Sequence, residues 1–130
     1  MAELRETILV VDDEPLVLRV TTAILELVGF EVLSASGADD ALNLCRRHPG
    51  FIQLALLDFL KSGMSGFVQD LTELLPGIRI VIMSGHDLNE IIRRGGITAK
   101  AFNFVQKPFT AEALTARLTE ILARPVTFVA

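Results

Sequence analysis

Five short apolar runs of strand length recur along the 130 residues, and a segment with helical spacing of apolar residues follows each run. The runs ILVV (8–11), LALL (54–57) and IVIM (80–83) are apolar throughout, which is typical of parallel strands covered by helices on both faces. Because crossovers between parallel strands are right-handed, the alternation predicts an open, doubly wound α/β sheet. The second and fifth runs are more mixed, so we expect them at the edges. The expected strands are Thr7–Val11, Glu31–Ala35, Gln53–Leu57, Arg79–Met83 and Ala101–Val105.

The segments between the strands carry helix boundaries. Pro15 suits the first turn of the first helix and Gly29 suits its end. Its apolar residues step by three and four, and we expect them on the buried face: Val17, Val20, Ile24, Leu27 and Val28. Ser36, with Asp39 three residues later, is a capping signal for the second helix. The remaining helices are expected at Phe67 to Leu75, from Asp87 to Gly95 and Gly96, and after Thr110 as a cap.

The composition limits the classes of function. With 51% hydrophobic and 22% charged residues the chain is a compact globular domain, and a net charge of −4 with dispersed basic residues disfavours nucleic acid and membranes as partners. No apolar run approaches the ~18 residues of a membrane span, so we expect a cytoplasmic protein. The single cysteine, Cys45, is expected to pack in the core. We expect one domain over residues 1–130, with a core from 7 to 123 and no output domain.

Residues that can carry chemistry follow the strands at the points where they end. The first strand is followed by Asp12, Asp13 and Glu14, and the third, fourth and fifth by Asp58, Ser84 and Lys107. Because functional groups of a doubly wound sheet gather beyond the carboxyl ends of its strands, we expect these residues in one pocket. Carboxylates this close resist ionisation unless a cation compensates for them. An all-oxygen site with open water positions favours Mg²⁺, which would compensate together with Lys107.

Each of these residues also has a purely structural interpretation. The acids after the first strand suit the positive N-terminus of the first helix. Asp58 and Ser84 could cap the helices that follow them, and Lys107 with Pro108 could form an ordinary turn. Their joint occurrence at successive strand ends favours the functional interpretation.

Four motifs, ILVVDDEP, LALLD, MSG and FNFVQKPF, stand in order at the expected strand ends. Together they resemble the receiver domain of two-component response regulators, over residues 7 to about 123. The resemblance implies a flavodoxin-like (βα)5 fold whose five-stranded parallel sheet has the strand order 2-1-3-4-5. The stretches MSGHD and KPFTAEAL look most like receivers appended to hybrid sensor histidine kinases.

The resemblance also implies a phosphoacceptor switch. The partner would be a sensor histidine kinase or a histidine phosphotransfer domain, whose phosphohistidine gives its phosphoryl group to Asp58 while Lys107 and Ser84 share the charge on the phosphoryl oxygens. Ser84 and Phe104 would then form the switch that changes the surface of the fourth helix, fifth strand and fifth helix for a downstream protein target. Such a domain assists its own phosphorylation and dephosphorylation and is not an enzyme. We expect a monomer or a weak dimer.

For the metal, the resemblance implies direct ligation of Mg²⁺ by Asp13, Asp58 and the backbone carbonyl of Leu60, with Asp12 acting largely through a bound water. The chain departs from the family after the acceptor, where Lys61 and Ser62 replace the usual Met and Pro. Losing the proline gives this loop more conformational freedom.

Two other classes of function remain open. A Mg²⁺-dependent hydrolase of the haloacid dehalogenase type would need an acid where Leu60 stands. A receiver fold that serves only as a binding module would usually lack the acceptor or the lysine, and this chain has both Asp58 and Lys107.

Overall fold

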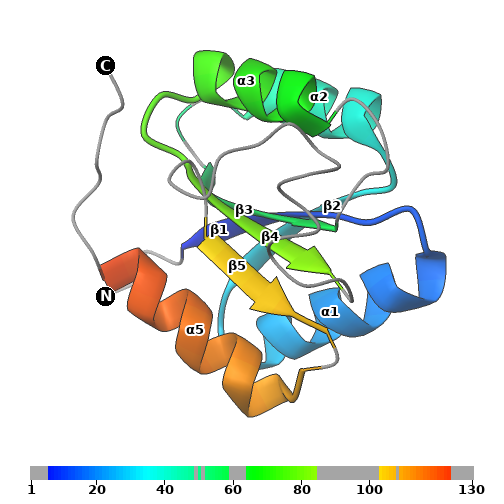
Figure 1. Cartoon of the computed structure of the whole chain (residues 1–130), viewed down its shortest axis with the longest axis vertical. Helices are drawn as coiled ribbons and strands as arrows, with labels where there is room; N and C mark the ends of the chain where they lie inside the picture. Colours follow the sequence, from blue (N-terminus) through cyan, green and yellow to red (C-terminus); the bar gives the residue numbers. More distant parts are fainter. Residues whose placement is uncertain are drawn as a thin grey trace.

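A computed structural model of the chain describes residues 6–48, 50, 52–58, 64–84, 103–107 and 109–123. Its elements are β1 (Thr7–Val11), α1 (Pro15–Leu27), β2 (Glu31–Ala35), α2 (Ala38–Arg47), β3 (Ile52–Asp58), α3 (Met64–Leu74), β4 (Arg79–Ser84), β5 (Asn103–Gln106) and α5 (Ala111–Ala123). Of these helices, α1 and α5 cover one face of the sheet and α2 and α3 cover the other (Figure 1). Within the described ranges, no helix is both long enough and apolar enough to cross a membrane.

The sheet is parallel and has the order β2-β1-β3-β4-β5. This confirms the expected strand order and the edge positions of the second and fifth strands. The strands β1 and β2 have the expected bounds, and β3 and β4 continue to the acid and the serine that follow their apolar runs. Val11 lies beside both Ala35 and Leu57 in the register. The first residues after β1 are therefore level with Asp58, the last residue of β3.

The sheet buries an apolar layer on each face because successive side chains of a strand point to opposite sides. The layer facing α1 and α5 includes Ile8, Val10, Leu54, Leu56, Val81, Leu25, Leu114 and Leu118. The layer facing α2 and α3 includes Leu9, Val11, Ala55, Leu57, Ile82, Cys45, Phe67 and Leu71. Cys45 therefore packs in the core, as expected. Both layers extend to the carboxyl ends of the strands, so the polar residues that follow the strands stand on well-packed apolar residues.

The buried face of α1 differs from the expected one. Of the expected residues, Val20, Leu27 and Val28 are 51%, 87% and 51% exposed, and Val17 and Ile24 are half buried. The buried residues of the helix are instead Thr21 and Leu25. The predicted face is wrong by about 100° around the helix, which is one residue's rotation. The reason lies in the helix sequence PLVLRVTTAILEL, which is so rich in apolar residues that more than one stripe fits the helical period.

The expected start of α2 also requires a correction. Its N-cap is Gly37, and no side chain caps the helix. Because α2 begins at Ala38, Ser36 stands one residue too early to be the cap. Asp39 and Asp40 lie in the first turn, where their negative charge interacts favourably with the helix dipole.

The predicted start and end of α1 and the predicted cap of α5 are confirmed. Pro15 begins α1, and Gly29, with a φ of 103°, follows its end in the left-handed conformation that glycine adopts without strain. Thr110 Oγ1 accepts a hydrogen bond of 3.0 Å from the amide of Ala113 and so caps α5. The third helix begins at Met64, three residues before its expected start. The expected fourth helix, from Asp87, lies outside the described residues.

The orientation of α1 predicts opposite effects for two leucines on the same helix. Replacing Leu25, which is fully buried, by Ala should lower the free energy of unfolding by about 2–5 kcal/mol because a cavity forms in the core. Leu27→Ala, two residues away, should change it by less than about 0.5 kcal/mol. Urea unfolding followed by far-ultraviolet circular dichroism measures both values. Equal losses, or a larger loss for Leu27→Ala, would contradict this orientation.

Candidate metal and phosphoryl site

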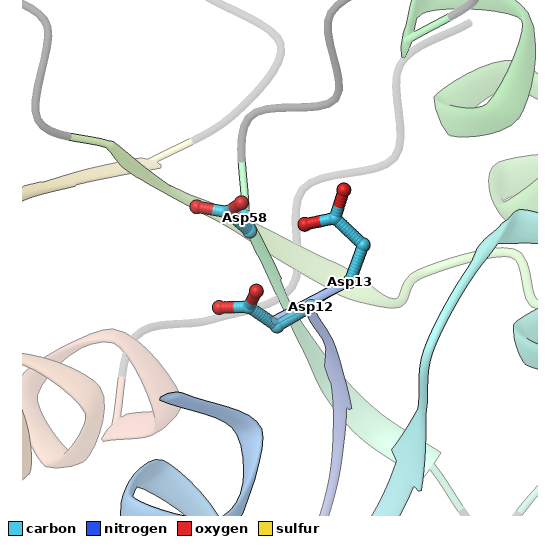
Figure 2. Close-up of side chains that lie close together, drawn as sticks. All are labelled: Asp12, Asp13 and Asp58. Carbon is cyan, nitrogen blue, oxygen red and sulfur yellow. The ribbon is translucent and has the colours of Figure 1, made fainter. Parts of the chain in front are cut away.

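The carboxyl ends of β1 and β3 bring three aspartates together. Asp12 and Asp13 directly follow β1, and Asp58 ends β3. Each of the three offers an oxygen that lies within 4.8 Å of the corresponding oxygens of the other two. Figure 2 shows the three side chains gathered at the ends of the two strands. The structure therefore brings together the described carboxylates that the sequence predicts as metal ligands.

Asp12 is the most deeply placed of the three, with only 1% of its surface exposed. Its backbone amide donates to the carbonyl of Ala35 on β2 at 3.1 Å, which fixes the turn after β1. Its Oδ1 accepts a hydrogen bond of 2.9 Å from the amide of Glu14, the N-cap residue of α1. Burial raises the pKa of Asp12, and the charge of Asp58 raises it further, although the Glu14 amide and the ammonium of Lys107 oppose both effects.

Lys107 approaches the acids from the end of β5. Its Nζ donates to Asp58 Oδ1 at 2.7 Å and lies 3.7 Å from Asp12 Oδ2. Its backbone amide donates to the carbonyl of Ser84 at 2.7 Å. Burial alone would lower the pKa of Lys107, but the hydrogen bond to Asp58 and the charges of Asp58, Asp12 and Glu14 outweigh burial and raise it. The lysine is therefore held in its charged form, against the carboxylates.

The arrangement suits a bound cation. Three carboxylates face one ammonium group in the described part of the site, so two negative charges are left uncompensated when all three carboxylates are ionised. Among the described residues, Asp12 Oδ2 is buried and has no hydrogen-bond donor. A buried carboxylate oxygen without a donor is costly unless a cation or water approaches it. The donor set, all oxygen, fits a hard divalent cation such as Mg²⁺.

The remaining predicted site residues lie at the same edge or beyond the described ranges. Ser84 ends β4, is 3% exposed and stands beside Gln106 of β5 in the register. Phe104 stands beside Ile82 and packs, half buried, against the apolar layer under α2 and α3. Leu60, whose backbone carbonyl is a predicted metal ligand, lies outside the described residues. The loop with Lys61 and Ser62, which departs from the family pattern, lies outside them as well.

One feature of the site region is absent from the sequence-based predictions. An apolar groove of about 680 Å³ runs between α1 and the segment after β5, and its lining consists of Leu16, Val17, Val20, Thr21, Ile24, Lys107 and Phe109. The apolar excess of α1 was the available signal for it.

Comparison with known proteins agrees with this geometry. The strand order and the three aspartates at the carboxyl ends of β1 and β3 define a flavodoxin-like α/β domain with a candidate cation site. Residues 8–119 match the response regulator receiver domain. The chain belongs to this family, the receiver domains of two-component response regulators, which act as phosphoacceptor switches in signalling.

Two curated relatives are similar in sequence, and a solved structure has the same fold. The probable transcriptional regulator ycf27 of Porphyra purpurea is 32% identical over 127 residues, which are 95% of this chain and 50% of that protein. The probable transcriptional regulatory protein TcrX of Mycobacterium tuberculosis is 31% identical over 91% of this chain and 50% of its own length. A response regulator receiver domain protein from Clostridium thermocellum superposes with a TM-score of 0.77 at 28% identity, over 90% of this chain and 94% of that one. The chain thus spans about half the length of the curated relatives.

The raised pKa of Asp12 predicts a pH-dependent gain in stability on its neutralisation. Because the folded protein binds the Asp12 proton more tightly than the unfolded chain, ionisation of Asp12 opposes folding at every pH above its raised pKa. Without divalent cations, Asp12→Asn should therefore unfold at a higher urea concentration than the wild type at pH 7. The difference should shrink as the pH falls and the wild-type Asp12 takes up its proton. Asp70→Asn, on the exposed side of α3, is the control and should show neither effect.

Proposed function

We propose that this domain accepts a phosphoryl group on Asp58 as one step of a two-component phosphorelay. The observation that carries the proposal is the 2.7 Å ion pair between Lys107 Nζ and Asp58 Oδ1, set beside Asp12 and Asp13. An oxygen of Asp58 would attack the phosphorus of a phosphohistidine on a sensor histidine kinase or a histidine phosphotransfer domain. The nitrogen–phosphorus bond breaks, and its electron pair remains on the imidazole.

Two side chains would assist this transfer by binding the phosphoryl oxygens. The ammonium of Lys107 already contacts an oxygen of Asp58, so it lies within reach of a group bound to that carboxylate. Ser84 ends β4, the strand paired with β3 on the side toward β5, and its hydroxyl would donate to another phosphoryl oxygen. Transfer of this kind depends on positioning and on charge neutralisation, which both residues supply.

A divalent cation completes the proposal. Asp12, Asp13 and Asp58 would hold Mg²⁺ together with the backbone carbonyl of Leu60. The buried Oδ2 of Asp12, which has no hydrogen-bond donor among the described residues and only a 3.7 Å ion pair with Lys107, supports a cation at this point. When bound, Mg²⁺ neutralises negative charge on the phosphoryl oxygens and leaves positions for water. Without it, the three carboxylates would repel a phosphoryl group.

The response to phosphorylation would begin at Ser84 and Phe104. Attraction of the Ser84 hydroxyl to a phosphoryl oxygen would change the end of β4. Phe104 on the neighbouring β5 is half buried, so an inward movement of its ring would bury further apolar surface. The altered surface of the fourth helix, β5 and α5 would then bind a downstream protein target. The domain would assist its own phosphorylation and dephosphorylation in the cytoplasm, without turning over a separate substrate.

Acetyl phosphate tests the acceptor directly. In the presence of Mg²⁺ the wild type should gain the mass of one phosphoryl group, as measured by intact-protein mass spectrometry, because acetyl phosphate is a small phosphodonor that needs no docking partner. Mass is the appropriate readout because the chain has no Trp or Tyr. Chelation of the metal should prevent the gain.

Two variants interpret the result. Asp58→Asn should show no gain, whereas Asp70→Asn, which removes an exposed acid on α3, should behave like the wild type. A wild type that binds Mg²⁺ but gains no mass would leave the unphosphorylated binding module as the function. Phosphorylation of Asp58→Asn would move the acceptor to another residue.

Binding of Mg²⁺ alone should stabilise the folded domain. At a concentration roughly one hundred times the dissociation constant, the free energy of unfolding should rise by about 2.7 kcal/mol, because the unfolded chain does not assemble the site. Asp13→Asn should lose most of this gain, since it removes an exposed carboxylate of the cluster. Thermal unfolding with and without Mg²⁺ measures the shift, and an equal shift in Asp13→Asn would exclude that residue as a ligand.

A further inference from the structure

The exposed side of α1 has the pattern of a coiled-coil seam. Leu16, Val20 and Leu27 are 70%, 51% and 87% exposed, and Ala23 between them is exposed as well. Their spacing of four, three and four residues matches alternate d and a positions of a heptad repeat. Contiguous exposed apolar surface of this kind marks an interaction site in a folded domain.

The two flanks of this seam differ in character. Arg19 and Glu26, both exposed, occupy the g positions of the two successive heptads. Val17 and Ile24 occupy the e positions on the opposite flank, where they are half buried and line the apolar groove beside Phe109. One flank therefore carries one charge of each sign, seven residues apart, and the other is apolar.

This pattern is self-complementary in only one orientation. When two such helices pack antiparallel about a twofold axis, the g flank of each faces the g flank of the other and the e flanks also meet. Leu16 then packs near Leu27 of the second copy, and Arg19 lies opposite Glu26 of the second copy. The same pair recurs through the symmetry axis. A parallel arrangement would not bring the two g flanks together.

We propose that α1 is a homodimer interface in which two copies of the chain pack antiparallel through Leu16, Val20, Ala23 and Leu27, with two symmetric Arg19–Glu26 pairs. The helix is about 20 Å long, so the contact falls at the small end of specific interfaces. The dimer should therefore be weak and depend on protein concentration. The proposal does not rest on phosphorylation of Asp58, and a failure of either leaves the other standing.

Sedimentation equilibrium of the full chain, from micromolar to millimolar concentration, tests this interface through exchange of the charges. The wild type should shift from monomer to dimer across this range. Arg19→Glu and Glu26→Arg should each weaken the dimer about tenfold or more, because each places like charges opposite one another twice. An equimolar mixture of the two variants should recover dimer, because the glutamates of one copy then face the arginines of the other. Arg47→Glu on α2, with the same change of charge, should leave the dimer unaffected.

The outcomes are decisive in both directions. Recovery of dimer in the mixture, with circular dichroism showing that each variant is folded, supports the antiparallel pairing. A wild type that stays monomeric at millimolar concentration overturns it, and so does a mixture that associates no better than its components. If Leu27→Glu leaves the oligomeric state unchanged but slows phosphoryl transfer from a histidine phosphotransfer domain, the face binds the phosphodonor and the homodimer is wrong.

Discussion

The ammonium group of Lys107 balances the carboxylates at the edge of the sheet, and the rest of the site depends on that balance. Asp12 directly follows β1 and Asp58 ends β3, and Lys107 reaches both from beyond β5, across the position of β4. Without the lysine, two acids fixed by strand geometry would repel one another in a poorly solvated place. With it, one oxygen of Asp58 is held while Asp12 Oδ2 is left without a hydrogen-bond donor among the described residues. The site is thus charge-compensated only in part, which is the condition in which a cation binds.

The sheet could be predicted because its signal is strong and local. The runs that form β1, β3 and β4 are apolar without alternation, and only burial on both faces explains such runs. The sequence predicts where the helices lie along the chain, but not which face of α1 is buried. In α1 nine of the 13 residues are apolar, so the period alone did not distinguish the stripe with Thr21 and Leu25, which faces the sheet, from the stripe with Val20 and Leu27, which faces away. That choice is set by the packing of the whole sheet surface, which no single helix encodes.

The site followed from the sheet, since the positions of Asp12, Asp13, Asp58, Ser84 and Lys107 are all consequences of where strands end. The spacing of these residues in the sequence does not predict that neighbouring acids differ in burial. Asp12 is buried and carries a raised pKa, whereas Asp13 is exposed, although the two are neighbours in sequence. The difference arises because the chain turns at this point. The amide of Asp12 donates a hydrogen bond to the carbonyl of Ala35, and its carboxylate accepts one from the amide of Glu14, two residues further along the chain.

The backbone of Lys107 has a fixed anchor, because its amide donates to the carbonyl of Ser84 at 2.7 Å. Its side chain meanwhile ends on Asp58. The long aliphatic part of the side chain connects these two contacts, and its backbone end is hydrogen-bonded to β4. A change of charge on Asp58 would therefore move the ammonium group by rotation about the single bonds of the Lys107 side chain. The pairing of the ends of β4 and β5 would stay the same. The backbone and the ammonium group of Lys107 thus have separate attachments, so a movement of the ammonium group does not require a break in the backbone hydrogen bond to Ser84.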